Sequence, residues 1–112
     1  MNKPMASNIS TSLIISTYNR SDALELCVKS VLRQSLLPDE IIIADDGSKE
    51  DTRELIHQLA ASSEVPIIHV WHEDLGFRLA SIRNKAIAKA SKEYIIQIDG
   101  DIVLHKDFVK DH

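Results

Sequence analysis

A chain of 112 residues has room for one domain with a single core, but not for two. Its 44% hydrophobic and 27% charged residues are typical of a soluble globular protein and argue against disorder. The formal net charge of −4 gives no electrostatic reason to expect nucleic acid as a partner. The single cysteine, Cys27, excludes an internal disulfide, and its place on an apolar helix face predicts a core position.

No apolar run is long enough to span a bilayer. Residues 1–12 form a polar N-terminal segment that lacks the apolar centre of a secretory signal. We therefore expect a cytoplasmic protein, with a peripheral position at the inner face of the membrane as the alternative.

Strands and helices are predicted to alternate from residue 13 onward. Short apolar runs mark the strands, and apolar residues at helical spacing mark the segments between them as helices. Asn19 or Ser21 is expected to cap the first helix, and Ser48 with Asp51 resembles a capping box for the second. The expected strands are 13–16, 41–44, 67–71 and 94–98, and the third helix is expected from about residue 79 to residue 91.

Three of the expected strands are continuous apolar runs rather than alternating ones. Such strands are buried on both faces, as in parallel sheets that helices cover on both sides. We therefore predict an α/β, Rossmann-like three-layer sandwich, with a mostly parallel sheet of about four strands and helices on both faces. In such sheets ligands bind at the carboxyl ends of the strands, near the switch in strand order.

Two acidic clusters follow predicted strands, Asp45-Asp46 and Asp99-Gly100-Asp101. Clustered carboxylates repel one another and need a counter-charge, most simply Mg²⁺ or Mn²⁺. Gly100 allows a tight turn and leaves space for a phosphate to approach. Turns of this kind are rich in Asp and Gly in any case, but two clusters that each follow a buried strand favour a binding site.

Several other side chains could contribute to such a site. Arg78 and Arg83 lie at the start of the third predicted helix, where positive charge favours a diphosphate, although a solvated helix face is the alternative for Arg83. Tyr18 could stack on a base or pack against its neighbouring loop. Trp71 could belong to the core, to an interface or to a platform for a sugar, and the core is predicted as the commonest of the three. His69 is predicted to be structural. The remaining histidines considered show no metal-ligand spacing with one another: His72, His105 and His112.

Four sequence blocks, in this order, resemble the inverting family 2 glycosyltransferases of the GT-A fold. They are residues 13–20 (LIISTYNR), 41–48 (IIIADDGS), 76–84 (GFRLASIRN) and 95–101 (IIQIDGD). The third block resembles the branch that contains bacterial polysaccharide polymerases and galactosyltransferase-like enzymes. The resemblance implies that residues 13–112 form the nucleotide-sugar-binding half of a GT-A domain, truncated after the Asp-x-Asp strand.

The resemblance also implies a role for each matching residue. Thr17 and Tyr18 would line the nucleoside pocket, and Asp46, or its neighbour Asp45, would accept a hydrogen bond from the base, usually uracil. Arg78 would contact the base or the diphosphate. The metal, Mn²⁺ or Mg²⁺, would assist departure of the nucleoside diphosphate. The implied donor-binding residues are Thr17, Tyr18, Asn19, Arg20, Asp45, Asp46, Arg78, Arg83, Asp99 and Gly100, and the implied metal ligands are Asp99 and Asp101.

In this family the general base lies after the Asp-x-Asp strand, so it is expected beyond His112 and no catalytic residue is expected in this chain. We expect the chain to bind a UDP-linked sugar donor, whereas transfer to a glycan or other hydroxyl acceptor would need a C-terminal half. The last strand would then expose an edge that favours self-association.

Two other classes share part of the pattern. Residues 96–103 fit the haloacid-dehalogenase-like phosphatase motif, in which Asp99 would attack phosphorus and Asp101 would act as acid and base. That motif normally opens its domain, however. A receiver-type signalling module would need its acidic pair after the first strand, where Thr17, Tyr18 and Asn19 stand instead. A sugar nucleotidyltransferase would need a glycine-rich, basic loop at the same place.

Overall fold

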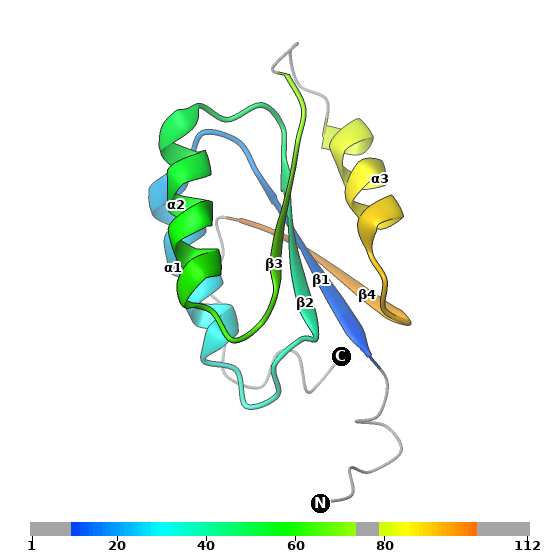
Figure 1. The fold of residues 1–112 in the computed structure, drawn as a ribbon. Coiled ribbons are helices and arrows are strands. Elements are labelled where there is room, and N and C mark those ends of the chain that lie inside the picture. Colours follow the sequence, from blue (N-terminus) through cyan, green and yellow to red (C-terminus); the bar gives the residue numbers. More distant parts are fainter. Residues whose placement is uncertain (1–9, 74–78, 101–112) are drawn as a thin grey trace, which may run out of the picture.

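The computed structural model describes residues 10–73 and 79–100. Within these ranges one sheet of four parallel strands has the order β3-β2-β1-β4. Helices α1 and α2 cover one face of the sheet and α3 covers the other (Figure 1). The predicted three-layer α/β architecture is confirmed. The elements are β1 (Thr11–Thr17), α1 (Ser21–Leu32), β2 (Glu40–Asp45), α2 (Glu50–Ser62), β3 (Ile67–Trp71), α3 (Leu79–Lys89) and β4 (Tyr94–Asp99).

The central strands supply two separate cores, because successive side chains of a strand point to opposite faces of the sheet. Leu13 and Ile15 of β1 pack in the core beneath α1 and α2. Ile14 of β1 and Ile42 of β2 pack in the other core, against Ile82 of α3. Burial of such a side chain stabilises a fold by about 1.5–3 kcal/mol. The continuous apolar runs therefore reflect strands that are covered on both sides.

The two predicted helix caps are wrong. The N-cap residue of α1 is Arg20 and that of α2 is Lys49, and neither makes a side-chain cap hydrogen bond. Ser21 instead donates its hydroxyl to Asp51 Oδ2 over 3.3 Å, which links the starts of the two helices. Asn19 and Ser48 join neighbouring loops to each other, and this use of their side chains explains why neither caps its own helix.

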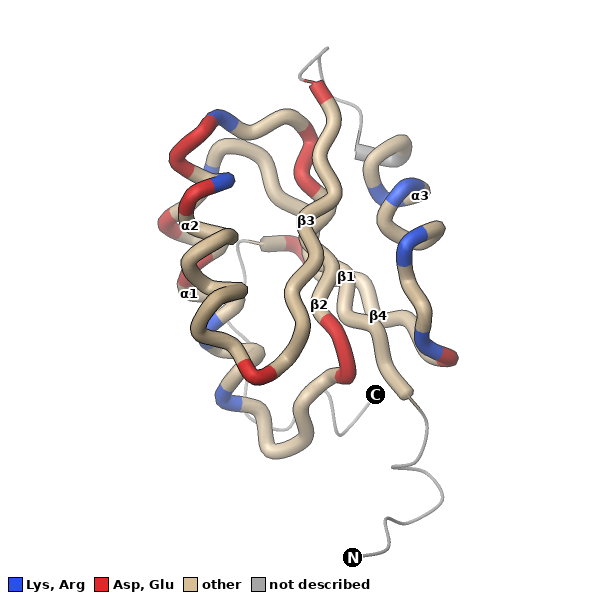
Figure 2. The backbone as a smooth tube through the Cα atoms, viewed as in Figure 1, with Lys and Arg blue, Asp and Glu red and all other residues tan. Residues whose placement is uncertain are grey.

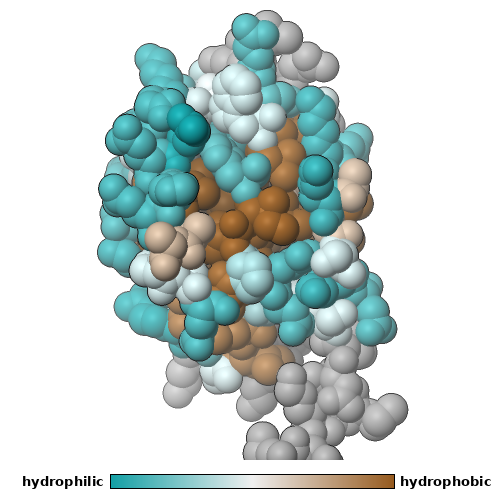
Figure 3. Space-filling view, viewed as in Figure 1, coloured by the Kyte–Doolittle hydropathy of each residue, from teal (hydrophilic) through white to brown (hydrophobic). Residues whose placement is uncertain are grey.

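The predicted core position of Cys27 is confirmed, since this residue is fully buried. The predicted core position of Trp71 is wrong: 51% of the residue is exposed. Its strand, β3, is a sheet edge in the described part of the chain and is paired with β2 alone. Apolar surface is accordingly visible over β3 between hydrophilic borders (Figure 3).

Helix α3 ends at Lys89, two residues before the predicted end. The reason lies in Glu40, which accepts hydrogen bonds from the backbone N–H and the hydroxyl of Ser91 at 2.9 and 3.1 Å. Glu40 also accepts one from Ser12 Oγ at 2.6 Å. This carboxylate thus joins β1, β2 and the segment before β4 at the amino end of the sheet.

None of the helices in the described ranges has both the length and the apolar character that crossing a membrane requires. Within those ranges β4 is the second sheet edge, paired with β1 alone. Self-association through this edge stays a prediction.

Candidate functional site

The order of the strands reverses beside β1, because β2 and β3 lie on one side of it and β4 on the other. In open α/β sheets ligands bind beside such a reversal, at the carboxyl ends of the strands. In register, Ser16 of β1 pairs with Asp99 of β4, and Thr17 pairs with Asp45 of β2. Asp45-Asp46 and Asp99 therefore lie at the same end of the sheet, where the strands have their carboxyl ends, although they are far apart in the sequence. This end of the sheet is called the edge below.

Asp99 is held through one carboxylate oxygen. Its Oδ1 accepts a hydrogen bond from Ser16 Oγ at 3.2 Å and one from Arg83 Nη2 at 3.0 Å. Among the described residues, Oδ2 accepts none, and 64% of the side chain is exposed. The contacts thus orient Asp99 and leave its second oxygen toward solvent, where a ligand could reach it.

Gly100 follows Asp99 in very close contact with β1. Its backbone N–H donates to the Ser16 carbonyl at 2.8 Å. A Cβ atom at this position would lie 2.7 Å from the same carbonyl oxygen, closer than real Cβ atoms approach. The residue must therefore be glycine for β4 to end where it does, so the space it leaves is required by the sheet itself.

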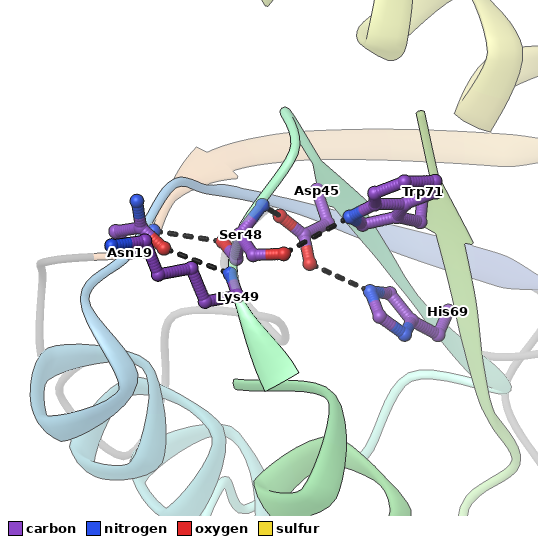
Figure 4. A network of polar contacts seen from close by, with 6 residues as sticks. All are labelled: Asn19, Asp45, Ser48, Lys49, His69 and Trp71. Carbon is purple, nitrogen blue, oxygen red and sulfur yellow. Dashed lines mark hydrogen bonds and ion pairs between the residues drawn. The ribbon is translucent and has the colours of Figure 1, made fainter. Parts of the chain in front are cut away.

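Asp45 belongs to the structure of the edge. It is fully buried, and its Oδ1 accepts a hydrogen bond from the Ser48 backbone N–H at 2.9 Å. Its Oδ2 lies 2.8 Å from His69 Nε2, a contact that joins the end of β2 to β3 and fits the structural role predicted for His69 (Figure 4). Since both oxygens have partners, Asp45 fixes the turn through Gly47, whose φ of 93° favours glycine.

Ser48 connects the loop that follows β1, its own loop after β2 and the last residue of β3 (Figure 4). Its hydroxyl accepts a hydrogen bond from the Asn19 backbone N–H at 2.8 Å, and its carbonyl accepts one from Trp71 Nε1 at 3.1 Å. The Asn19 side chain in turn accepts a bond from the Lys49 backbone N–H at 2.9 Å. Asn19, which has a left-handed φ of 48°, thus links the loop after β1 to the loop after β2.

Asp46 lies on the α3 side of the edge and is almost completely buried, with 3% of its side chain exposed. Its Oδ1 is hydrogen-bonded to His72 Nε2. The other ring nitrogen of His72 lies 3.5 Å from Lys85 Nζ. His72 therefore lies between Asp46 and a basic residue of α3. Lys and Arg residues are distributed along α3, which contains no acidic residue (Figure 2).

The remaining predicted site residues differ in their surroundings. Thr17 is buried, and its Oγ1 finds no hydrogen-bond partner among the described residues. Tyr18 is 44% exposed. Arg20 is exposed and lies 3.5 Å from Asp22 Oδ1. Two predicted site residues lie outside the described ranges: Arg78 and Asp101.

His72 and Lys85 also belong to this end of the sheet, although their positions in the sequence did not indicate it. The signal for His72 was weak: a polar residue directly after a predicted strand, with no metal-ligand spacing to another histidine. Lys85 gave no signal beyond its place in an amphipathic helix. Their contact depends on how α3 packs across β1 and β2, which spacing along the chain does not reveal.

The described residues fit a divalent cation only as part of a shared site. No group of three or more His, Cys, Asp or Glu side chains within residues 10–73 and 79–100 could hold a metal ion. Asp99 does offer one exposed carboxylate oxygen, the ligand type that Mg²⁺ and Mn²⁺ prefer. Such ions are commonly bound by one or two carboxylates together with substrate phosphates and water, and Asp99 fits that arrangement.

The sequence model described as "Glycosyl transferase family 2" matches residues 12–112. The chain belongs to glycosyl transferase family 2. The family resemblance stated from the four sequence blocks is thereby confirmed, and the phosphatase and receiver-type alternatives are not favoured. A chondroitin synthase from Pasteurella multocida is 32% identical to this family 2 chain over 101 residues, which is 89% of the chain. The chain spans 10% of that relative's own length.

Solved structures share the fold of this family 2 chain. A mannosyltransferase from Pyrobaculum calidifontis, solved in complex with GDP-Man and Mn²⁺, superposes with a TM-score of 0.79 at 21% identity over 90% of the chain and 30% of its own. TarS from S. aureus, solved in complex with UDP-GlcNAc, gives a TM-score of 0.73 at 23% identity over 92% and 30%. These likenesses confirm the expected GT-A fold.

Proposed function

We propose that this chain forms the donor-binding part of an inverting, metal-dependent glycosyltransferase that uses a UDP-linked sugar. The observation that carries the proposal is the position of Asp99, which is exposed and oriented where the strand order reverses, in a family 2 chain. Residues 13–112 would be the nucleotide-sugar-binding half of the GT-A domain. Two structural neighbours support a nucleotide-sugar donor, since they were solved with UDP-GlcNAc and with GDP-Man.

The nucleoside would bind across the ends of β1 and β2. Tyr18 is exposed and can stack on the base, and the buried Thr17 Oγ1, which has no partner among the described residues, can bond to the nucleoside. Of the two acids after β2, we assign the base to Asp46, and we assign Asp45 to the turn that it holds together through Ser48 and His69. Asp46 is buried, so the proposal includes a local opening that lets the edge of the base reach it.

The diphosphate would lie toward α3. Arg83 is partly exposed beside Asp99 and can donate to phosphate oxygens, and Arg78 would act with it. Gly100 would take part through its backbone, because the position of its missing side chain is already filled by the Ser16 carbonyl of β1. Asn19 and Arg20 would shape the loop that borders the nucleoside.

Asp99 and Asp101 would hold Mn²⁺ or Mg²⁺ together with the donor phosphates. When bound, the cation would stabilise the negative charge of the departing nucleoside diphosphate as a Lewis acid. Asp99 would keep its orientation through Ser16 and Arg83. The neighbour that was solved with Mn²⁺ supports a divalent cation in this fold.

The acceptor would be a glycan or another hydroxyl compound. The general base that deprotonates the acceptor hydroxyl would lie after Asp101, outside the residues that the structure describes. The similarity to a chondroitin synthase supports a glycan acceptor. A cytoplasmic or peripheral membrane position fits such a reaction and belongs to the same proposal.

Isothermal titration calorimetry of the chain with UDP in the presence of Mn²⁺ tests the donor site. We expect metal-dependent binding that Asp99→Asn and Asp101→Asn each weaken by about tenfold or more. Glu64→Gln is the matched control, because it removes an exposed acidic charge from the α2–β3 connection at the opposite end of the sheet. If no nucleoside diphosphate binds to the unsubstituted chain, the proposed function is wrong.

A further inference from the structure

Three polar side chains from three different segments form a line on the α3 side of the sheet. Asp46 follows β2, His72 follows β3 and Lys85 belongs to α3. His72 lies in the middle, hydrogen-bonded to Asp46 through Nε2 and 3.5 Å from Lys85 Nζ through Nδ1. Only 9% of the His72 side chain and 3% of the Asp46 side chain are exposed. The contact between His72 and Asp46 is therefore buried.

The partners of His72 define its proton arrangement. A lysine ammonium can only donate, so in a hydrogen bond between these two atoms, which lie 3.5 Å apart, Nδ1 of His72 is the acceptor. The proton of a neutral ring then sits on Nε2, from which it is donated to Asp46 Oδ1. The His72 backbone N–H also donates to the Asp45 carbonyl at 3.4 Å, which holds the ring beside the acids.

We propose that His72 is a positioning residue for Asp46, fixed in its donating tautomer by Lys85. This inference rests on the proposed function, in which Asp46 accepts the imide N–H of a uracil base. Because His72 binds one oxygen of the carboxylate, it contributes to fixing the plane of the group that the base would meet.

The second histidine–aspartate pair of the edge provides an internal comparison. His69 and Asp45 make a contact of the same kind on the opposite face of the sheet. The remaining oxygen of Asp45 is bonded to the Ser48 N–H, so this pair closes a turn. A substitution at His69 therefore disturbs a similar pair without touching Asp46.

The test compares UDP with N3-methyl-UDP, an analogue that lacks the imide N–H. Calorimetry with saturating Mn²⁺ gives the ratio of the two affinities, which we expect to be about tenfold or more in favour of UDP. His72→Phe keeps a flat ring but loses both nitrogens, and should reduce the ratio to nearly one. His72→Gln keeps an N–H donor and should retain a ratio within about threefold of the original.

His69→Phe is the matched control and should lower stability without changing the ratio. Thermal unfolding followed by circular dichroism shows which variants are folded. If His72→Phe does not fold, Lys85→Met, at an exposed position on α3, replaces it and should reduce the ratio by about threefold.

The outcomes separate the inference from the proposed function. The inference is overturned if a folded His72→Phe or Lys85→Met variant keeps the original ratio of the affinities for UDP and N3-methyl-UDP. It is also overturned if His69→Phe reduces this ratio as much as His72→Phe does. Binding of UDP without preference over N3-methyl-UDP overturns the inference and leaves the donor site standing. Absence of UDP binding to the unsubstituted chain overturns both.

Discussion

Arg83 Nη2 lies 3.0 Å from Asp99 Oδ1, which joins α3 to the last residue of β4. The side chains are 37% and 64% exposed, so the pair contributes little to stability, about 0–1 kcal/mol. Its importance lies in its place, because it orients a carboxylate and adds positive charge where the strand order reverses.

Replacement of Arg83 by methionine should therefore separate binding from stability. We expect the affinity for UDP with Mn²⁺ to fall by about tenfold, because one charge-assisted contact to phosphate and the orientation of Asp99 are both lost. The midpoint of urea unfolding should stay nearly unchanged. Lys89→Met removes an equal charge from the exposed end of α3 and should leave the affinity intact. Equal losses in the two variants would show that only the overall charge of α3 matters.

Substitutions at Asn19 should reveal two separable contributions to stability. Asn19→Gly keeps the left-handed φ of 48° but loses the bond to the Lys49 N–H, and should cost about 1 kcal/mol. Asn19→Ala should cost about 1–2 kcal/mol more, because Cβ clashes in that conformation. Urea unfolding measures both. Identical stabilities of the two variants would contradict a role for the backbone conformation.

Gly100→Ala should destabilise the chain by about 1–3 kcal/mol, because the added Cβ meets the Ser16 carbonyl oxygen at 2.7 Å. The neighbour is backbone, so the end of β4 must move to relieve the contact. We therefore expect weaker binding of UDP with Mn²⁺ as well, since Asp99 moves with it. Gly47→Ala, at another glycine of the same edge, should destabilise through its φ of 93° instead. A Gly100→Ala variant as stable as the original would contradict the packing argument.

Glu40→Gln should reduce stability in a pH-dependent way. Burial raises the pKa of Glu40, but hydrogen bonds from Ser12 and Ser91 outweigh it and hold the pKa below its ordinary value of 4.5. Stability from this group is therefore present above about pH 4.5 and is lost as the pH falls through the lower folded pKa. At pH 7 the substitution should cost about 1–3 kcal/mol, because an amide places a donor against donors.

Urea unfolding at pH 7 and near pH 3 measures this effect. The difference between the original chain and Glu40→Gln should shrink at the lower pH, because the stabilisation by the ionised carboxylate is lost as the pH falls through the lowered pKa of Glu40. Glu93→Gln, an exposed neighbour at the same end of the sheet, should show no such change. A difference that is constant with pH would mean that the charge of Glu40 does not stabilise the fold.

Local patterns in the sequence were sufficient to predict the layers of the fold. The isoleucine runs of β1 and β2 indicated strands covered on both faces, and the two cores confirm this. The predicted strands began too late, because Ser12 and Glu40 are polar residues that do not resemble buried strand residues. They are buried because each satisfies the other, a contact between residues 28 positions apart that periodicity does not reveal.

The candidate site was predicted from its acids but not from their partners. Asp45, Asp46 and Asp99 stood out because each follows an apolar run. The histidines that bind the first two come from β3 and the residue after it, 24 and 26 positions away. Trp71 was misplaced for a related reason: whether a strand is central or lies at an edge depends on sheet order, which hydrophobicity does not report.

The isoleucine run of β2 has a consequence for how the strands align during folding. A shift of one residue moves every side chain of a strand to the opposite face. For Ile41, Ile42 and Ile43 such a shift would exchange one apolar side chain for another, because both faces are apolar. The buried acids at the two ends, Glu40 and Asp45, would instead lose their partners and enter apolar surroundings. The middle of β2 therefore stabilises the sheet without specifying its alignment, which its acidic ends determine.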